Sequence, residues 1–391
     1  MAQVKISTRG AKRIRRGHLW VYRSDVRDVN DAGAGAIVSV VDEAGNFVGQ
    51  AFYSDASEIA LRFLTTGEEA IDREWWRTRL RQCAQRRAGI ARETDAYRLV
   101  YSEGDLLPSL IVDVYAGTMV MQNLSQGSER VKSDLFELLA EEFAPRGIVE
   151  RNDARVRELE GLELRCGVLY GAVDGESPEE IEINQHGVRF LVSPLGGQKT
   201  GAFLDQRENY LAARHVAHGR ALDCFTFNGG FALHIAPACD SVLGVDISAD
   251  AVAGAQRNAA LNEAHRVEFR AANVFDALRE LEADGERFDT IILDPPAFAK
   301  NRASVKSAVR GYKEINLRAL KLLNPGGVLL TCTCSYHISE DLFLEIIEDA
   351  ALDARRRLQI IEKRGQSTDH PVLLGVPETH YLKCVIARVV E

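Results

Sequence analysis

Three patterns of hydrophobic and polar residues follow one another along the chain. In residues 36–64, the short runs AIVSVVD, FVGQAFY and EIALRFL alternate apolar and polar positions and are separated by Gly and Asp. Alternation with a period of two predicts half-buried strands. We therefore predict a small β-barrel as the first domain, residues 1–70.

A helix and then a mixed α+β region are predicted next. The segment REWWRTRLRQCAQRRAGIAR, residues 73–92, places Trp76, Leu80 and Cys83 at helical spacing with Arg between them. This pattern predicts an exposed basic helix. Strands at SLIVDVYAG, TMVMQNL, GIVERND and LYGAV surround a helix at KSDLFELLAEEFA. Residues 71–187 are thus predicted to form an α+β domain, and it contains no obvious chemistry.

From residue 188 onward, apolar strands alternate with helices. The strand cores are RALDCF, SVLGVD, RVEFRA, FDTIILD and GVLLTCT, and segments such as DAVAGAQRNAALNEA separate them. This alternation predicts a parallel, doubly wound α/β sheet over residues 188–391. Ligands of such sheets bind at the carboxyl ends of the strands, so we expect the chemistry just after each strand.

Composition excludes several classes of protein. With 46% hydrophobic and 27% charged residues among 391, the chain is globular rather than disordered or fibrous. The seven cysteines lack the paired spacing of a zinc site or a disulfide framework. No stretch approaches the roughly 20 apolar residues of a membrane span, and the N-terminus has no apolar signal core. We expect a cytoplasmic protein with no membrane partner and no metal.

Charge is divided unevenly along the chain. The net charge of −9 argues against nucleic acid, because phosphates are neutralised by Lys and Arg. The first 100 residues, however, carry 17 Lys and Arg against 13 Asp and Glu, a net +4, so the rest carries −13. Arg16 and Trp20 lie in the most basic stretch and are candidate RNA contacts, through phosphate and base stacking. A solvated basic face around core aromatics is the alternative.

Polar residues at the ends of the first three strands suggest a nucleoside site. The first strand ends in DCFTFNGGFALHIA, which lacks the GxGxxG spacing that binds a pyrophosphate. Asp246 ends the second strand, 23 residues after Asp223, where a carboxylate can accept hydrogen bonds from ribose hydroxyls. After the third strand, Asn273 can read an adenine edge, and Val274 or Phe275 can pack on the ring. Ordinary capping of strand ends is the alternative for each polar residue. The candidate cofactor residues in these turns are Asp223, Phe225, Asn228, Gly229, Asp246, Ile247, Asn273 and Val274.

At these turns the chain resembles class I S-adenosylmethionine-dependent methyltransferases, whose cofactor has an adenosine but no pyrophosphate. The motifs GGQKTGAFLDQRENY, DPPAFAK, TCTCS, GQSTDHPV and PETHYLKC extend the resemblance to the RlmI-like family of bacterial 23S rRNA 5-methylcytosine methyltransferases, over nearly the whole chain. The resemblance implies an N-terminal PUA domain, matched by RRGHLWVYRSDV, an α+β linker domain and a Rossmann-like methyltransferase domain. It also implies S-adenosylmethionine as cofactor and large-subunit rRNA as partner.

The same resemblance suggests roles for the segment KTGAFLDQR. It implies that Lys199, Asp205, Gln206 and Arg207 line the methionine end of the cofactor and the entrance for the substrate. The alternative is a surface loop leading into a helix, with Asp205 as its cap.

The DPPAFAK turn follows the fourth strand. Pro295 and Pro296 fix the backbone and remove two N–H groups, so the turn presents Asp294 rigidly beyond the strand. Phe298 can stack on a base, and we expect Pro295, Pro296 and Phe298 to contact the substrate. Asp294 is the candidate for binding the cytosine N3/N4 edge and protonating N3, a role that requires a raised pKa. The turn alone does not choose the reaction, since related enzymes use it to methylate nitrogens.

A cysteine after the fifth strand favours methylation of carbon. Carbon 5 of cytosine is a poor nucleophile, and a thiolate that adds to C6 makes it reactive. The resemblance places the family's TCS signature on Thr333, Cys334 and Ser335, with Cys334 as nucleophile, while Cys332 in the apolar run is a rival. DPPAFAK lacks the second cysteine that many RNA 5-methylcytosine enzymes carry, so the base that removes the C5 proton stays unassigned.

The sequence therefore predicts methyl transfer from S-adenosylmethionine to carbon 5 of a cytidine in 23S rRNA through a covalent Cys–C6 adduct. One alternative is an RNA guanine or adenine N-methyltransferase that uses DPPAF without an adduct. The other is a non-catalytic RNA-binding ribosome assembly factor. The target nucleotide and the oligomeric state, including a homodimer, are left open.

Overall fold

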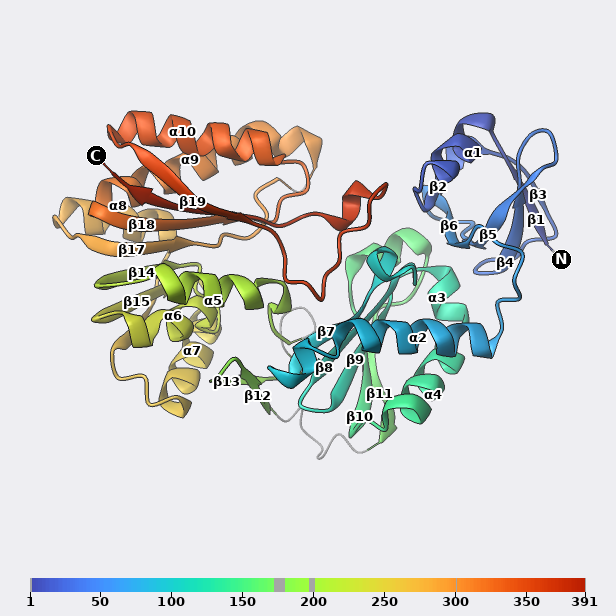
Figure 1. Cartoon of the computed structure of the whole chain (residues 1–391), viewed down its shortest axis with the longest axis horizontal. Helices are drawn as coiled ribbons and strands as arrows, with labels where there is room; N and C mark the ends of the chain where they lie inside the picture. Colours follow the sequence, from blue (N-terminus) through green and yellow to red (C-terminus); the bar gives the residue numbers. More distant parts are fainter. Residues whose placement is uncertain (1, 172–179, 197–200, 300, 391) are drawn as a thin grey trace. The chain divides into compact units, whose positions relative to one another are not determined.

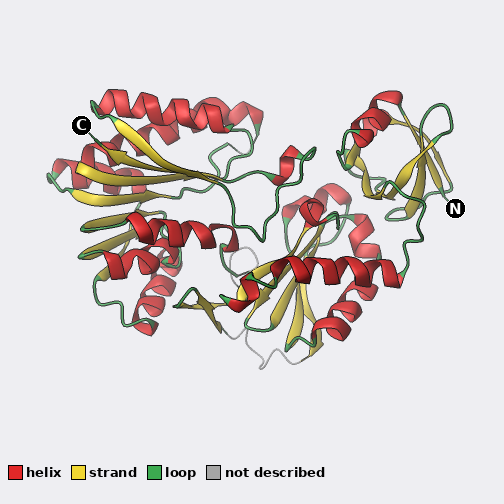
Figure 2. Cartoon of the chain, viewed as in Figure 1, coloured by secondary structure: helices red, strands yellow, loops and turns green. Residues whose placement is uncertain are grey.

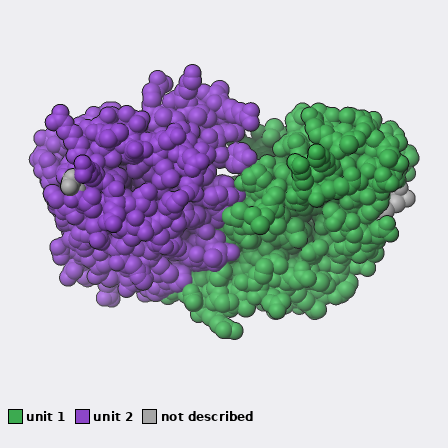
Figure 3. All heavy atoms as spheres, turned by 45° about the horizontal axis from the view of Figure 1, so that its top comes forward, with its two compact units in different colours: residues 1–184, 192–204, 369–379 green, residues 185–191, 205–368, 380–391 purple. Residues whose placement is uncertain are grey.

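The structure is a computed structural model that describes residues 2–171, 180–196, 201–299 and 301–390. Contacts between residues divide the chain into two compact units (Figure 3). Unit 1 comprises residues 1–184, 192–204 and 369–379, and unit 2 comprises residues 185–191, 205–368 and 380–391. A short segment near the C-terminus thus belongs to the unit formed by the front of the chain.

Unit 1 begins with a six-stranded sheet that curls around its own core (Figure 1). Its strand order is β2-β6-β5-β4-β1-β3. The elements are β1 (Gln3–Ile6), α1 (Thr8–Arg15), β2 (Trp20–Tyr22), β3 (Val26–Asn30), β4 (Ile37–Val41), β5 (Phe47–Tyr53) and β6 (Ile59–Thr65). Strands β4, β5 and β6 coincide with the three alternating runs, so the predicted strands are confirmed. Helix α1 begins at Ser7, whose hydroxyl accepts a hydrogen bond from the backbone N–H of Gly10.

The rest of unit 1 is an α+β layer, as predicted. A five-stranded sheet has the order β11-β10-β9-β8-β7. Its elements are α2 (Arg73–Arg87), β7 (Ala96–Tyr101), β8 (Leu110–Tyr115), β9 (Thr118–Asn123), α3 (Gln126–Arg130), α4 (Lys132–Phe143), β10 (Gly147–Asn152) and β11 (Arg165–Gly171). Helix α2 buries Trp76, Leu80 and Cys83 against this layer, which confirms the helical spacing of these residues.

Unit 2 is built on a seven-stranded sheet with helices on both faces (Figure 2). The strand order is β16-β15-β14-β17-β18-β20-β19, and only β20 runs antiparallel to its neighbours. The strands are β14 (Arg220–Cys224), β15 (Ser241–Asp246), β16 (Val267–Ala271), β17 (Phe288–Leu293), β18 (Leu323–Thr333), β19 (Leu358–Arg364) and β20 (Lys383–Val389). A separate two-stranded sheet is formed by β12 (Ile181–Gln185) and β13 (Val188–Val192).

Helices cover both faces of the seven-stranded sheet, which explains its nearly continuous apolar strands. In Figure 1, one face carries α5 (Arg207–Val216), α6 (Gly230–Ile235) and α7 (Ala249–Leu261), and the other carries α8 (Val274–Ala283), α9 (Val305–Leu322) and α10 (Glu340–Ala354). The predicted doubly wound α/β architecture is confirmed. The order of the parallel strands reverses between β14 and β17, and ligands of such sheets bind beyond the carboxyl ends at that point.

Candidate active site

The turn after β14 adopts a backbone that few residues tolerate. Phe225, Phe227 and Gly229 have φ angles of 64°, 50° and 88°, in the left-handed region. A Cβ at Gly229 would also lie 3.0 Å from the Phe269 ring, so glycine is required for both conformation and space. Within the protein, the N–H of Thr226 donates to the carbonyl of Val245 and the N–H of Gly229 donates to the carbonyl of Thr226, at 3.1 and 2.9 Å, so internal hydrogen bonds hold the turn in this shape.

Asp246 connects this turn to the next. Its Oδ2 accepts a hydrogen bond of 2.9 Å from the N–H of Phe227, and its Oδ1 accepts one of 2.9 Å from the N–H of Ser248. The adjacent Ile247 is apolar and 71% exposed. A carboxylate beside an exposed apolar side chain fits a nucleoside, whose ribose binds the carboxylate while the base packs on the apolar group.

Asp223 lies beneath the turn rather than at its surface. Its Oδ2 accepts hydrogen bonds from the Thr226 hydroxyl at 2.6 Å and from the N–H of Ala232 at 3.0 Å. Burial raises the pKa of Asp223 to about 7, opposed by these hydrogen bonds, and the carboxylate of Asp246 adds to the rise. Asp223 therefore shapes the turn from within. The backbone carbonyl of Asn228 accepts a hydrogen bond of 3.0 Å from Asn258 on α7.

The expected adenine contacts in the third turn differ in exposure and in their hydrogen bonds. The side-chain oxygen of Asn273 accepts a hydrogen bond of 2.9 Å from the N–H of Phe275, which caps helix α8. Val274 is buried in the core of unit 2, whereas Phe275 is only half-buried. Of the two apolar candidates, Phe275 is the one placed to pack on a ring.

The Asp294 carboxylate is held by a chain of amides from α5. Its Oδ1 accepts a hydrogen bond of 2.8 Å from Nε2 of Gln206. The Gln206 oxygen accepts one of 2.6 Å from Asn209, whose own oxygen accepts one of 2.8 Å from Arg364. Each amide is oriented by the next, so Gln206 presents its NH2 group to Asp294.

Asp205 forms hydrogen bonds with two segments near the C-terminus. Its backbone carbonyl accepts hydrogen bonds from the N–H and the hydroxyl of Ser367, at 2.8 and 3.0 Å. Its Oδ2 accepts a hydrogen bond of 2.6 Å from the Tyr381 hydroxyl. Helix α5 has Gln206 rather than Asp205 at its N-cap position.

Sequence reasoning missed Asn209, Ser367 and Tyr381 as parts of this site, although GQSTDHPV and PETHYLKC contain the latter two. Arg207, expected at the substrate entrance, is 1% exposed and contacts Glu208, an arrangement that favours a structural role. Lys199 lies outside the described residues.

The two candidate cysteines differ in accessibility. Cys332 is fully buried within β18, opposite Cys384 of β20, and burial raises its pKa well above the usual range. Cys334 lies just after the strand and is half-buried. A nucleophile must be reached by its substrate and must ionise, and Cys334 is the accessible one of the two.

Tyr312 of α9 joins the cysteine turn to the DPPAF turn. Its hydroxyl lies 2.8 Å from the hydroxyl of Thr333 and 2.9 Å from that of Ser335, the residues that flank Cys334. The Ser335 hydroxyl also accepts a hydrogen bond of 3.1 Å from the N–H of Ala299. The fully buried Tyr312 thus fixes both turns at one edge of the sheet.

The aromatic residue of the DPPAF turn belongs to the same assembly. The Phe298 ring packs 4.6 Å from the Tyr312 ring and 6.0 Å from the Phe275 ring, measured between centroids. Phe298 is half-buried, Pro295 is buried and Pro296 is exposed. Of the three expected contacts, Pro296 and Phe298 are accessible to a substrate, whereas the burial of Pro295 disfavours its expected contact.

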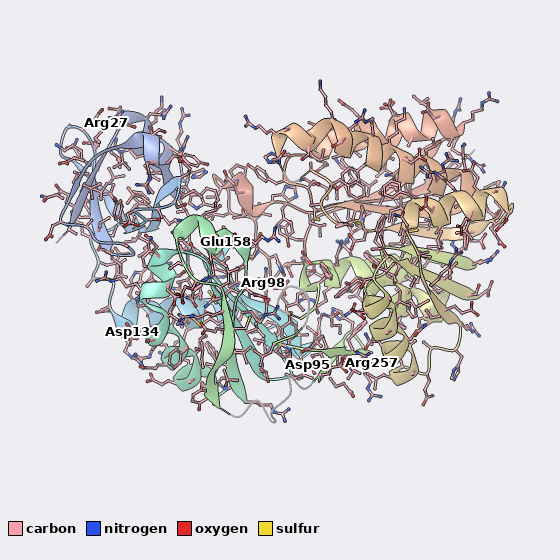
Figure 4. All side chains as sticks on the ribbon, turned by 180° about the vertical axis from the view of Figure 1, so that it is seen from behind. Arg27, Asp95, Arg98, Asp134, Glu158 and Arg257 are labelled. Atoms are coloured by element: carbon pink, nitrogen blue, oxygen red, sulfur yellow. The ribbon has the colours of Figure 1, made fainter. Side chains whose placement is uncertain are left out.

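The predicted RNA contacts lie in unit 1. Arg16 is exposed at the end of α1, whereas Trp20 is half-buried and donates its indole N–H to Glu103 at 2.9 Å. Several neighbouring bases are already paired with acids; Arg27 of β3, labelled in Figure 4, bonds Glu43 at 3.0 Å. The other paired bases are Arg9 and Arg13 with Asp25, and Arg15 with Asp42. Within the described chain, Lys12 and Arg16 are the exposed bases of α1 and its C-cap that lack such a pairing.

Helix α2 is also less basic in effect than its sequence indicates. Arg77 and Arg81 bond Glu142 of α4 at 2.9 and 2.6 Å. Arg73 bonds Glu141 at 2.7 Å. The prediction of an exposed basic helix is therefore only partly confirmed: Arg81 and Arg86 are exposed, but Arg87 is buried, and acids of α4 pair with several of the other arginines.

The described residues contain neither a metal-binding cluster nor a membrane-spanning helix. Among the described residues, no cluster of three or more His, Cys, Asp or Glu side chains is arranged to hold a metal ion. No described helix has the length and apolar character needed to span a membrane.

Comparisons with known proteins agree with this geometry. Residues 4–66 match the family of PUA-like domains, and residues 164–381 match the family of S-adenosylmethionine-dependent methyltransferases. The Shewanella denitrificans protein named ribosomal RNA large subunit methyltransferase I is 39% identical over 396 residues, covering 99% of each chain. The protein of that name from Klebsiella pneumoniae (strain 342) is 40% identical over 386 residues, covering 97% of this chain and 96% of the relative. The structure of SMU.776, described as a methyltransferase complexed with SAH, has a TM-score of 0.86 at 19% identity and covers all of both chains.

The fold and the family match, which spans residues 164–381, define the class: this is an S-adenosylmethionine-dependent methyltransferase with an N-terminal PUA-like domain. Its identity of 39% and 40% to full-length relatives shows more. The chain belongs to the ribosomal RNA large subunit methyltransferase I family, and S-adenosylmethionine is its cofactor. The expected family, fold class and cofactor are confirmed.

Proposed function

We propose that this protein transfers a methyl group from S-adenosylmethionine to carbon 5 of a cytidine in 23S rRNA, through a covalent adduct of Cys334. The relatives' names support large-subunit rRNA as the substrate. The observation that carries the choice of atom is the half-buried Cys334, whose neighbours Thr333 and Ser335 bond Tyr312 beside the turn of Asp294. Because a base inside a stack cannot reach a buried methyl donor, the cytidine enters flipped out.

The cofactor residues follow from the turns described above. Asp246 would accept hydrogen bonds from the ribose hydroxyls, and Ile247 and Phe275 would pack against the adenine. The backbone of the 225–229 turn and the amide of Gln206 border the methionine end. Bound S-adenosylmethionine supplies a methyl group that C5 takes as the methyl–sulfur bond breaks, leaving S-adenosylhomocysteine.

The protein's own residues carry the remaining steps. The thiolate of Cys334 forms a bond to C6, and the C5–C6 π electrons move into the ring while N3 takes a proton from Asp294. After methylation, a base removes the proton from C5, the C6–sulfur bond breaks to regenerate the thiolate, and N3 returns its proton. Phe298 stacks on the flipped ring and excludes water from the reacting face.

RNA containing 5-fluorocytidine tests the proposal. Fluorine at C5 cannot leave as a proton, so the adduct persists and survives denaturing electrophoresis. We expect the adduct with the wild type and with Cys332→Ser, the matched control, and none with Cys334→Ser. An adduct that persists in Cys334→Ser and disappears in Cys332→Ser would identify Cys332 as the nucleophile instead.

The same variants separate the alternative functions. An N-methyltransferase would keep its activity in Cys334→Ala and lose it in Asp294→Ala, and mass mapping of the modified nucleosides names the base and atom. A non-catalytic assembly factor would fail to bind S-adenosylmethionine in isothermal titration, or would bind it equally well after Asp246→Ala.

A further inference from the structure

A buried lysine lies beside the cysteine turn. Lys383 begins β20 and pairs with Thr333 in the register of β18 and β20. It is 6% exposed, and its Nζ donates to the backbone oxygen of Ser335 at 3.4 Å and to that of Tyr381 at 3.2 Å. These two carbonyls belong to the residue after Cys334 and to the residue that bonds Asp205. The ammonium therefore joins the end of β18 to the segment that precedes β20.

Within the part of the chain that the structure describes, no carboxylate forms an ion pair with this lysine. None of the ion pairs among the described residues includes Lys383, and the two carbonyls use two of its three N–H groups. A buried ammonium without a carboxylate is costly unless another anion compensates it. The anions whose charge acts on Lys383 are the thiolate of Cys334 and the carboxylate of Glu340 on α10.

The electrostatic neighbours of Lys383 point to the thiolate. Burial lowers the pKa of Lys383, and the charges of Cys334 and then of Glu340 oppose that decrease. Glu340 already bonds Lys363 at 2.6 Å at the surface. From α9, the Tyr312 phenol also interacts with Cys334, and it carries no charge at neutral pH because burial raises its pKa.

We propose that Lys383 is a positioning residue that supplies the counter-charge for the Cys334 thiolate. The role of Lys383 in catalysis rests on the proposed function. An opposite charge nearby favours the ionised form, so the ammonium increases the fraction of thiolate available at neutral pH. Its bonds to the carbonyls of Ser335 and Tyr381 hold the ammonium at the residue that directly follows Cys334.

The test measures thiolate formation directly, without RNA or cofactor. The full-length protein is alkylated with iodoacetamide over a range of pH, and mass spectrometry of the peptide that contains Cys334 gives the rate at that residue. We expect Lys383→Met and Lys383→Gln to move the midpoint of the pH–rate curve upward by about one unit or more. Lys383→Arg retains the charge and is expected to stay close to the wild type, as is the control Lys321→Met on the same unit.

Two outcomes would overturn the inference. The first is an unchanged midpoint in Lys383→Met or Lys383→Gln, with folding verified by circular dichroism. The second is an equal shift in Lys383→Arg, which would show that shape rather than charge matters. Using both Met and Gln keeps the test available if one variant does not fold.

Methyl transfer provides the second readout. We expect kcat of Lys383→Met to fall about tenfold at neutral pH, which corresponds to a shift of about one pH unit in the midpoint of the pH–rate curve. As pH rises, kcat should approach the wild-type value. KM for S-adenosylmethionine is expected to stay unchanged. If Cys334→Ser keeps C5 methylation, the proposed function fails, whereas the alkylation result decides the role of Lys383 independently.

Discussion

Tyr312 is the single residue on which the geometry of the two reacting turns depends most. Its hydroxyl bonds both neighbours of Cys334, and its ring supports Phe298. Cys334 and Phe298 both lie beyond the ends of their strands, so their relative position depends on such side-chain bonds. One buried phenol therefore couples Cys334, the proposed nucleophile, to Phe298, the ring proposed to stack on the base.

Replacing Tyr312 by Phe tests this coupling. The variant keeps the ring and removes the bonds to Thr333 and Ser335, so we expect kcat for methyl transfer to fall about tenfold because a small misplacement of the nucleophile is costly. KM for S-adenosylmethionine should remain near the wild type, since the Asp246 turn is untouched. The unfolding free energy should decrease by about 1 kcal/mol. Tyr53→Phe, a buried tyrosine of unit 1, is the control, and an equal loss of kcat there would refute the coupling.

The candidate residues named from the sequence differ from the missed ones in the kind of information that locates them. Asp246, Asp294 and Cys334 follow apolar strands directly, so the end of a parallel strand was enough to place them at one edge of the sheet. Asn209 bonds Arg364 as well as the nearby Gln206, and Tyr381 bonds Asp205; the pairs with Arg364 and Asp205 are more than 150 positions apart, and no local pattern encodes such pairs. The choice between Val274 and Phe275 depended on the rotation of α8, which a strand-end argument does not fix.

At the scale of elements, the segment 369–379 is part of unit 1 although its sequence neighbours belong to unit 2. The guanidinium of Arg87, at the end of α2, bonds both oxygens of Asp105 at 2.7 and 2.6 Å and the carbonyl of Asp369 at 2.8 Å. The Asp369 carboxylate accepts the N–H of Arg98, labelled in Figure 4, at 2.8 Å. A buried ion pair thus anchors the C-terminal segment to α2 and β7.

Breaking that ion pair tests its contribution. Arg87 and Asp105 are each 2% exposed, so Asp105→Asn leaves a buried guanidinium without its counter-ion. We expect the unfolding free energy of unit 1 to decrease by about 3 kcal/mol. All three tryptophans, Trp20, Trp75 and Trp76, belong to unit 1, so urea unfolding followed by tryptophan fluorescence reports on it.

Asp134→Asn is the matched control for that experiment. Asp134 is an exposed partner of Arg73, 3.6 Å away, and surface pairs of this kind contribute little. We expect no measurable change. Equal stability of Asp105→Asn and the wild type would mean that the pair does not anchor the segment.

The elements that periodicity predicted are the ones with a single clear period. Strands β4 to β6 alternate, and β14 to β18 are apolar runs of strand length, so both sets could be recognised. Strand β20, KCVIARV, is buried on both faces, and nothing in its residues shows that it runs antiparallel between β18 and β19. The assignment of segment 369–379 to unit 1 likewise depends on Arg87 and Asp105, more than 250 positions away.

At the scale of the whole molecule, the net positive charge of the first 100 residues overstates the charge that is available to bind RNA. The first 100 residues carry +4, but many of their arginines already pair with Asp or Glu. An ion-paired base releases few counter-ions when RNA binds, because its charge is largely compensated before binding. The sequence could give the number of charges in this region but not their pairing, which is a property of the fold.

Exposed bases without an acidic partner should therefore dominate the electrostatic part of RNA binding. We expect the double variant Lys12→Ala/Arg16→Ala to weaken binding of a 23S rRNA fragment about tenfold at low salt and to reduce the slope of log affinity against log salt by about one to two. Arg81→Ala, which removes a base paired with Glu142, should leave the slope nearly unchanged. Fluorescence anisotropy at several salt concentrations measures both quantities. If Arg81→Ala lowered the slope as much as the double variant, formal charge rather than pairing would govern RNA binding by this region.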